Sequence, residues 1–170
     1  MDDAISEYKK TLALNPQKVE AYINLGVAYL KKGELDAAVK EYRRALFIKP
    51  GYAEAHYNLG IALAKQRKWD ASIKEYTQLI ALNPQNVEAH INLGVAYMNL
   101  DKFKEAQDAF THAIGINPNH AGGHNNLAMA YFKDKKYALA IKHCDKALKL
   151  GFNVPPKLLK SLMPHRKGSK

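Results

Sequence analysis

Four asparagines recur at one spacing along the chain, since Asn24, Asn58, Asn92 and Asn126 are each separated by 34 residues. A primary amide both donates and accepts hydrogen bonds, so it can pair with a peptide backbone without reading side chains. Two apolar sets share the spacing and flank the asparagines: Val27, Ile61, Val95 and Met129, and Ile23, Tyr57 and Ile91. Together these residues are candidates for a peptide-binding surface.

Three histidines, His56, His90 and His124, have the same spacing. A shared metal ion would need all three within about 2 Å, whereas packed neighbouring helices hold equivalent residues about 9 Å apart. We therefore expect semi-buried packing histidines and no metal site.

None of the four serines lies in a nucleophile turn, and the sequence has no glycine-rich phosphate loop. The sequence predicts a non-catalytic protein without a cofactor.

The elements that carry these residues follow from a self-similarity of 34 residues. It is marked by four prolines, Pro16, Pro50, Pro84 and Pro118. In the unit 19–52, apolar residues at helical spacing predict a first helix over 19–32 and a second over 35–48. The second helix must stop before Pro50, because a residue that precedes proline is pushed out of the helical region. A fixed period of this length predicts a stacked repeat array.

Small residues inside the helices predict how each pair packs. Gly26, Gly60 and Gly94 lie within first helices, where glycine costs about 1 kcal/mol relative to alanine. That cost indicates close approach, and we expect the partners to be the small residues of the second helices, Ala38, Ser72 and Ala106. The fourth full repeat pairs Ala128 with Ala140. Cys144 replaces the aromatic residue of the other second helices and is expected to be a small buried hydrophobe.

The period, the Asn-Leu-Gly segments, the tyrosine three residues later and the closing proline together resemble the tetratricopeptide repeat family, over residues 2–154. The resemblance implies an all-α, right-handed α-solenoid of 34-residue helix-turn-helix repeats, of the bacterial type, with first helices on the concave face. It also implies a protein–protein interaction scaffold that holds an extended peptide or a helix in its groove. The asparagines look like the ladder of O-linked N-acetylglucosamine transferase, whose catalytic domain is absent here.

A second binding mode of the family fits poorly. In chaperone-binding arrays, a carboxylate clamp of Lys, Asn and Arg side chains grips an acidic C-terminal motif. Here Ile23, Val27, Glu88 and Asn92 occupy the places where that clamp needs Lys, Asn, Lys and Arg. Only Asn58 matches the clamp.

The sequence predicts an array with unequal ends. A half repeat over 2–18 precedes full repeats over 19–52, 53–86, 87–120 and 121–154. The half repeat lacks its first helix, so we expect Ile5, Tyr8 and Leu12 to be exposed and to favour self-association, unless the chain was cut from a longer array. Residues 155–163 are predicted to form a capping helix that buries Leu158, Leu159, Leu162 and Met163. Residues 164–170 are predicted to be a basic disordered tail.

Charge is concentrated near the C-terminus. The net charge is +10, of which residues 133–170 contribute +9. The candidate basic surface consists of Lys133, Lys135, Lys136, Lys142, Lys146 and Lys149. It could meet an acidic partner or an anionic membrane surface, or simply be a solvated end, and nucleic acid is the less favoured partner.

The sequence also bears on the compartment of the protein and on alternative functions. It has no apolar run long enough to cross a bilayer and no secretory signal, which favours the cytoplasm. The single cysteine is compatible with a reducing compartment. Besides a peptide-binding scaffold, the alternatives are a self-assembling structural module and a regulatory fragment of a larger enzyme.

Overall fold

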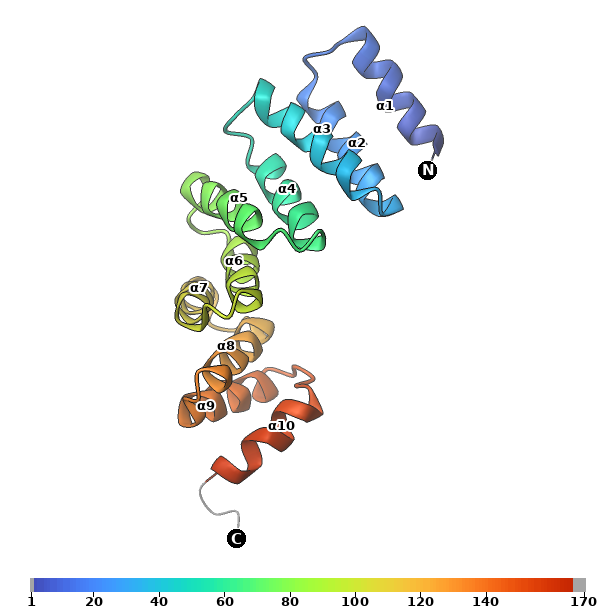
Figure 1. The fold of residues 1–170 in the computed structure, drawn as a ribbon. Helices are drawn as coiled ribbons and strands as arrows, with labels where there is room; N and C mark the ends of the chain where they lie inside the picture. Colours follow the sequence, from blue (N-terminus) through green and yellow to red (C-terminus); the bar gives the residue numbers. More distant parts are fainter. Residues whose placement is uncertain (1, 167–170) are drawn as a thin grey trace. The chain divides into compact units, whose positions relative to one another are not determined.

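The computed structural model describes residues 2–166, and within that range the chain forms helices without any strand (Figure 1). The helices are α1 (Asp2–Leu14), α2 (Val19–Lys32), α3 (Leu35–Ile48), α4 (Ala53–Lys65), α5 (Trp69–Leu82), α6 (Val87–Asn99), α7 (Phe103–Ile116), α8 (Ala121–Lys133), α9 (Tyr137–Lys149), α10 (Pro156–Leu162) and a short 3-10 helix η1 (Met163–His165). The all-α repeat fold predicted from the 34-residue period is confirmed. The chain divides into two compact units, Met1–Pro84 and Gln85–Lys170, which we call unit 1 and unit 2.

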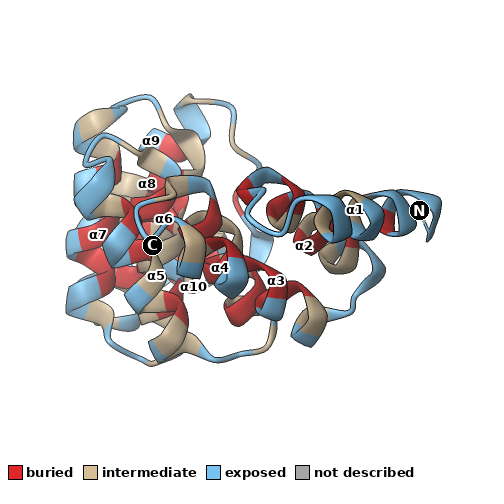
Figure 2. Ribbon diagram, turned by 90° about the horizontal axis from the view of Figure 1, so that it is seen from above, coloured by how far each residue is buried: buried red, intermediate tan, exposed pale blue. Residues whose placement is uncertain are grey.

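Each unit is a stack of helix pairs. In unit 1, α2 packs on α3 and α4 on α5, while α3 also contacts α4 and α1 contacts α2. In unit 2, α6 packs on α7 and α8 on α9, while α7 contacts α8 and α10 contacts α9. Buried residues, red in Figure 2, lie along the helix faces that meet within each unit. The apolar stripes of the sequence are therefore buried locally, as a repeat array requires.

The turn inside each pair uses a left-handed residue. Gly33 has φ of 79°, and Arg67, Asp101 and Lys135 have φ of 60°, 54° and 59°. These residues are 34 apart, so one turn geometry recurs four times. Only glycine adopts this region without strain, and other residues lose about 1–2 kcal/mol there. Packing of the two helices therefore maintains the turn even where the sequence does not favour it.

The link between successive pairs is set by proline. Lys49, Asn83 and Asn117 each precede a proline and each leave the helix, with φ of −134°, −142° and −127°. This is the predicted effect of the proline ring on the preceding residue.

The helix glycines also contact aromatic rings, in addition to the small partners expected from the sequence. A Cβ atom on Gly26, Gly60 or Gly94 would lie 2.5, 2.6 or 2.5 Å from the ring of Tyr42, Tyr76 or Phe110. The expected partners Ala38, Ser72 and Ala106 are also fully buried, and Ser72 Oγ donates a hydrogen bond of 2.9 Å to the Gly60 carbonyl. The glycine is therefore needed chiefly to leave room for the ring.

The fourth pair uses a different combination at the same place. Ala128 replaces the glycine, and Cys144 replaces the ring; both are fully buried. Because a thiol is much smaller than a phenol ring, the alanine methyl group has room there. Burial raises the pKa of the Cys144 thiol, in keeping with its predicted role as a small hydrophobe.

The N-terminal helix is covered more than the sequence indicated. Ile5, expected to be exposed, is buried against Leu25 and Ala28 of α2, and Tyr8 and Leu12 are half-buried in the same cluster. A helix that lacks its own pair partner can still pack on the first helix of the next repeat. The face expected to seek a second molecule is thus used mainly within the chain.

The C-terminal helix covers the last pair as a cap. Leu158 and Leu162 are buried with Val154 against α9, and Leu159 is half-buried. Met163 is 58% exposed, so the expectation that it joins the buried face is corrected. The sequence placed residues 164–166 in a disordered tail, but Pro164 and His165 complete η1, and Arg166 forms a two-bond ion pair with Asp145. Residues 167–170 of that predicted tail lie outside the described residues.

Candidate functional site

The four asparagines occupy one position on the first helices. Asn24 and Asn58 lie on α2 and α4 of unit 1, and Asn92 and Asn126 lie on α6 and α8 of unit 2. Asn24 is exposed and the other three are half-buried. Asn126 accepts a weak hydrogen bond of 3.5 Å from Asn125 Nδ2. Within residues 2–166, the amides of Asn24, Asn58 and Asn92 form no side-chain hydrogen bond, so their donors and acceptors remain open to a ligand.

The residues one turn after the asparagines are accessible as well. Val27 and Ile61 are half-buried, and Val95 and Met129 are both 37% exposed. Residues three apart share a helix face. Each first helix therefore presents one amide beside one apolar side chain.

The other predicted flank differs from the expectation. Ile23 and Ile91 are only 1% and 7% exposed, and they belong to the cores of unit 1 and unit 2. Ile91 lies against α8, where a Cβ on Gly123 would be 3.3 Å from its Cδ1. Tyr57 alone is half-buried. These isoleucines are buried because the residue directly before each asparagine points about 100° away from it around the helix, toward the neighbouring helix. A ligand on the asparagine face therefore cannot contact Ile23 or Ile91.

Asn125 occupies the fourth copy of this buried position and was not among the binding residues predicted from the sequence. Its side chain is 5% exposed, and its Oδ1 has no hydrogen-bond partner within residues 2–166. The signal was present in the sequence, because a polar residue there breaks a pattern of Ile, Tyr and Ile. A buried amide oxygen without a donor is rare enough to require a reason.

The histidines tie first helices to the turns that precede them. His56 Nε2 lies 2.8 Å from the Pro50 carbonyl oxygen, and His124 Nε2 lies 3.0 Å from that of Pro118. The other ring nitrogens meet Glu75 Oε2 at 2.7 Å and His143 Nδ1 at 3.0 Å. Burial, with His124 close by, lowers the pKa of His143 to about 4. Across residues 2–166, no three His, Cys, Asp or Glu side chains gather as metal ligands.

The predicted basic surface is only partly free. Lys136 forms an ion pair of 2.7 Å with Asp134 and donates to Gln107 Oε1 at 3.1 Å. Gln107 donates in turn to Asp134, and these two contacts hold the pKa of that carboxyl below its usual range. Lys136 thus links α7 to the α8–α9 turn, and its ammonium group is already used in contacts within the protein.

The remaining lysines of that surface are exposed. Lys135 lies in the turn, Lys133 ends α8, and three others lie on α9: Lys142, Lys146 and Lys149. Their spacing of four and three residues gathers the α9 lysines on one face.

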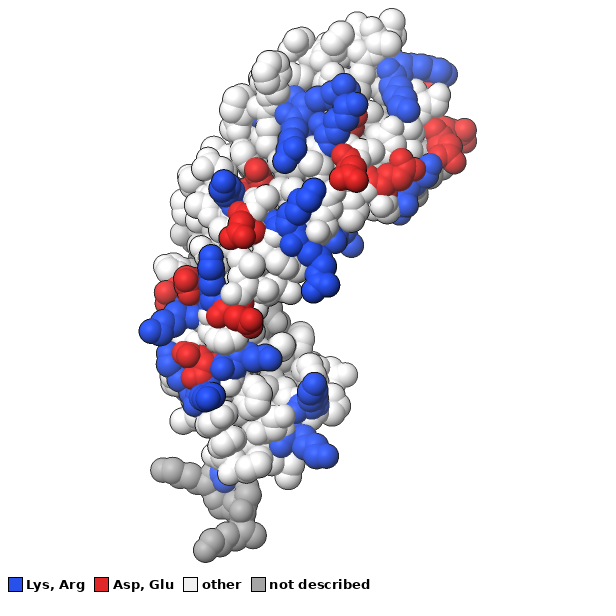
Figure 3. All heavy atoms as spheres, viewed as in Figure 1, with Lys and Arg blue, Asp and Glu red and all other residues white. Residues whose placement is uncertain are grey.

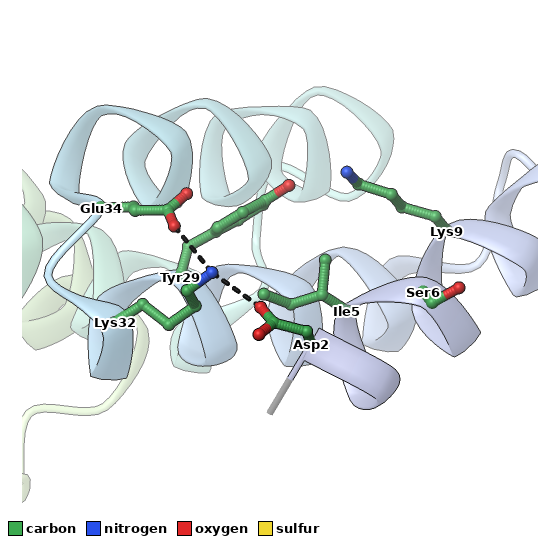
Figure 4. A pocket seen from close by; sticks show the side chains of 7 residues that line it. All are labelled: Asp2, Ile5, Ser6, Lys9, Tyr29, Lys32 and Glu34. Atoms are coloured by element: carbon green, nitrogen blue, oxygen red, sulfur yellow. Dashed lines mark hydrogen bonds and ion pairs between the residues drawn. The ribbon is translucent and has the colours of Figure 1, made fainter.

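A shallow pocket lies at the start of unit 1, between α1 and α2. Figure 4 shows Lys32 between two carboxylates, with Nζ 2.7 Å from Asp2 Oδ1 and 3.1 Å from Glu34 Oε1, and with Ile5 and Tyr29 beside them. Lys32 holds the pKa of Asp2 below its usual value. Because Lys32 already pairs with both carboxylates of this pocket, the pocket connects α1 to α2 and is a poor ligand site. None of the helices within residues 2–166 is long and apolar enough to span a membrane.

Comparisons with known families match almost the whole array. A model described as TPR repeat matches residues 1–33, 28–67 and 65–101, and one described as tetratricopeptide repeat matches residues 87–120 and 121–151. No curated protein matches the sequence.

Solved structures of MamA share the fold. A crystal structure of MamA has a TM-score of 0.85 and 29% identity, covering 88% of this chain and 88% of that one. Another crystal structure of MamA protein has a TM-score of 0.83 and 30% identity, over 88% and 81% of the two chains. MamA 41-end from Desulfovibrio magneticus RS-1 has a TM-score of 0.84 and covers 88% and 85%, but at 21% identity it supports the fold alone.

Proposed function

Since this chain belongs to the tetratricopeptide repeat family, we propose that it is a non-catalytic protein-interaction scaffold whose first helices bind an extended peptide. One observation carries the proposal. Equivalent asparagine amides, uncommitted within residues 2–166 at Asn24, Asn58 and Asn92, stand beside accessible apolar side chains on successive first helices. This pairing of an amide with an apolar contact is what binding to a peptide backbone requires.

The dimensions of a peptide fit two asparagines in each unit. Neighbouring helices pack about 8–10 Å apart, and an extended peptide advances about 3.3 Å per residue. A peptide that crosses α2 and α4, or α6 and α8, would meet an asparagine at about every third residue. Such binding selects an extended backbone, while Val27, Ile61, Val95 and Met129 would favour apolar side chains.

The experiment starts from peptides selected by the intact protein. A displayed library of 12-residue random peptides is enriched on the wild-type chain, and the selected peptides are titrated against Asn58→Ala and Asn92→Ala. Each lost hydrogen bond contributes about 0.5–1.5 kcal/mol, so each change should weaken binding about two- to twelvefold. The fold should persist, because alanine is the better helix former.

A matched control uses Gln78, an exposed amide on the second helix α5. Gln78→Ala removes a similar group outside the first helices and should leave binding unchanged. Selected peptides that bind both asparagine variants as tightly as the wild type would refute the backbone-binding proposal. Binding through uncharged amides should also persist at high salt.

A second candidate function is the binding of a partner's acidic surface to the lysines of α9. Lys142, Lys146 and Lys149 are exposed on one helix face, without an ion pair to any residue in 2–166. Changing all three to glutamine should abolish a salt-sensitive interaction and leave asparagine-dependent binding intact.

A further inference from the structure

An apolar pocket of about 240 Å³ lies in unit 2 between α8 and α10. Its walls include Met129, Phe132 and Lys133 from α8 and Lys157, Leu158 and Ser161 from α10. The two elements meet because the α10 segment continues the 34-residue register: Leu158 stands 34 residues after His124. α10 thus takes the place of a further first helix, and its apolar face meets that of α8.

The rim of the pocket is positively charged without compensation. Lys133 and Lys157 are exposed, and neither has an ion pair with any residue in 2–166. On the face shown in Figure 3, α10 carries blue side chains with no red beside them. An apolar cavity between two free ammonium groups is complementary to a bulky apolar side chain with carboxylates on either side.

A hydrogen-bond acceptor without a donor lies next to the pocket wall. Asn125 Nδ2 is 3.8 Å from the sulfur of Met129, and the Oδ1 of the same buried amide has no partner within residues 2–166. The Met129 side chain is flexible and partly exposed, so a peptide N–H beside it is the kind of donor that would satisfy this oxygen.

We propose that the α8–α10 pocket anchors one bulky apolar residue of the bound peptide, with Asp or Glu as its neighbours. This inference rests on the proposed function, because Asn126, on the same helix α8, would hold the backbone next to the anchor. It adds one anchor residue with acidic neighbours to the general preference for apolar side chains that Val27, Ile61, Val95 and Met129 would give. The partner is thereby defined as an acidic segment with a single aromatic or large aliphatic residue.

The probe is a fluorescein-labelled peptide of ten residues with Asp-Glu-Phe-Asp-Glu at its centre and Gly and Ser elsewhere, with both termini blocked. Anisotropy titrations compare it with a Phe→Ala peptide and with an Asn-Gln-Phe-Asn-Gln peptide. Burial of the phenylalanine should make the parent peptide bind about tenfold more tightly, or better, than the alanine peptide. Removal of its acidic residues should weaken binding and remove the salt dependence.

Variants of the protein locate the site. Lys133→Gln/Lys157→Gln should weaken binding about two- to thirtyfold, as expected for two exposed ion pairs. The matched control, Lys40→Gln/Lys74→Gln, makes the same charge change at exposed positions of the second helices α3 and α5, outside the pocket, and should bind normally. Asn125→Leu restores an apolar residue at the pattern position, so it should weaken peptide binding while preserving or raising the unfolding midpoint.

Any one of these outcomes would overturn the proposal: equal losses in the pocket variant and its control, equal binding of the Phe and Ala peptides, no binding of the parent peptide, or binding only to vesicles of anionic phospholipid. The variant Asn92→Ala/Asn126→Ala distinguishes a failure of the proposed backbone contacts from a failure of the proposed anchor pocket. If it leaves peptide binding unchanged while the pocket variant weakens it, the anchor is supported and the asparagine contacts fail. If only the asparagine variant weakens binding, the anchor fails.

Discussion

Replacing Gly60 with alanine tests the packing rule inside the helix pairs. The added Cβ would lie 2.6, 2.9 and 3.0 Å from three ring atoms of Tyr76, which is fully buried and has little room to move. Overpacking of this kind costs about 1–3 kcal/mol. Alanine recovers about 1 kcal/mol as the better helix former, so the net loss should be about 0–2 kcal/mol.

Gly115 provides the matched control because it too lies inside a helix. A Cβ there would meet nothing within 4 Å, so Gly115→Ala gains helix propensity without a clash and should stabilise by up to about 1 kcal/mol. The stabilities of the two variants should therefore differ by about 1–3 kcal/mol, the overpacking cost alone.

The fourth helix pair supplies the compensating change. Gly60→Ala/Tyr76→Cys reproduces the combination of Ala128 with Cys144, so the double variant should be more stable than the sum of its two single effects implies. Urea unfolding followed by circular dichroism measures all variants, and fluorescence of Trp69, the only tryptophan, reports on unit 1. Equal stability changes in Gly60→Ala and Gly115→Ala, or strict additivity in the double variant, would refute the reasoning.

Three further predictions concern the cap, the turns and acid. Leu162→Ala should lower stability by about 2–5 kcal/mol because the side chain is fully buried, whereas Met163→Ala should change it by less than about 0.5 kcal/mol; equal urea midpoints would show that the cap does not contribute. Arg67→Gly should stabilise by up to about 1 kcal/mol, since the left-handed φ strains arginine, and a lower midpoint would contradict this. The folded pKa of His143, about 4, lies below its ordinary value, so its contribution is complete above about pH 6.5 and is lost as the pH falls toward 4; His143→Gln should flatten a melting-temperature profile across that window.

Local and periodic features were predictable because each repeat packs only on its neighbours. The helix ends before prolines, the paired helices and the burial of Cys144 follow from propensity and pattern over a few residues. The turns were predicted in place but not in conformation, because Arg67, Asp101 and Lys135 adopt a left-handed geometry that only Gly33 favours. Packing of the helix pair overrides the intrinsic preference of those residues.

The functional surface was only partly predictable. The asparagines and the residues one turn later are accessible, as a shared helix face implies. Ile23 and Ile91 were wrongly predicted to contact a ligand. An apolar residue next to a binding position has the same sequence pattern whether its side chain faces a ligand or a neighbouring helix.

The amino-acid sequence by itself determined the repeat length, the helical fold and the equivalence of Asn24, Asn58, Asn92 and Asn126, since these depend on spacing along the chain. Contacts between helices decided the rest: that the helix glycines accommodate aromatic rings, that Lys136 is engaged, and that Lys133 and Lys157 flank one apolar pocket. Such contacts join residues that no local pattern relates, because they depend on how side chains of unlike size fill the space between packed helices.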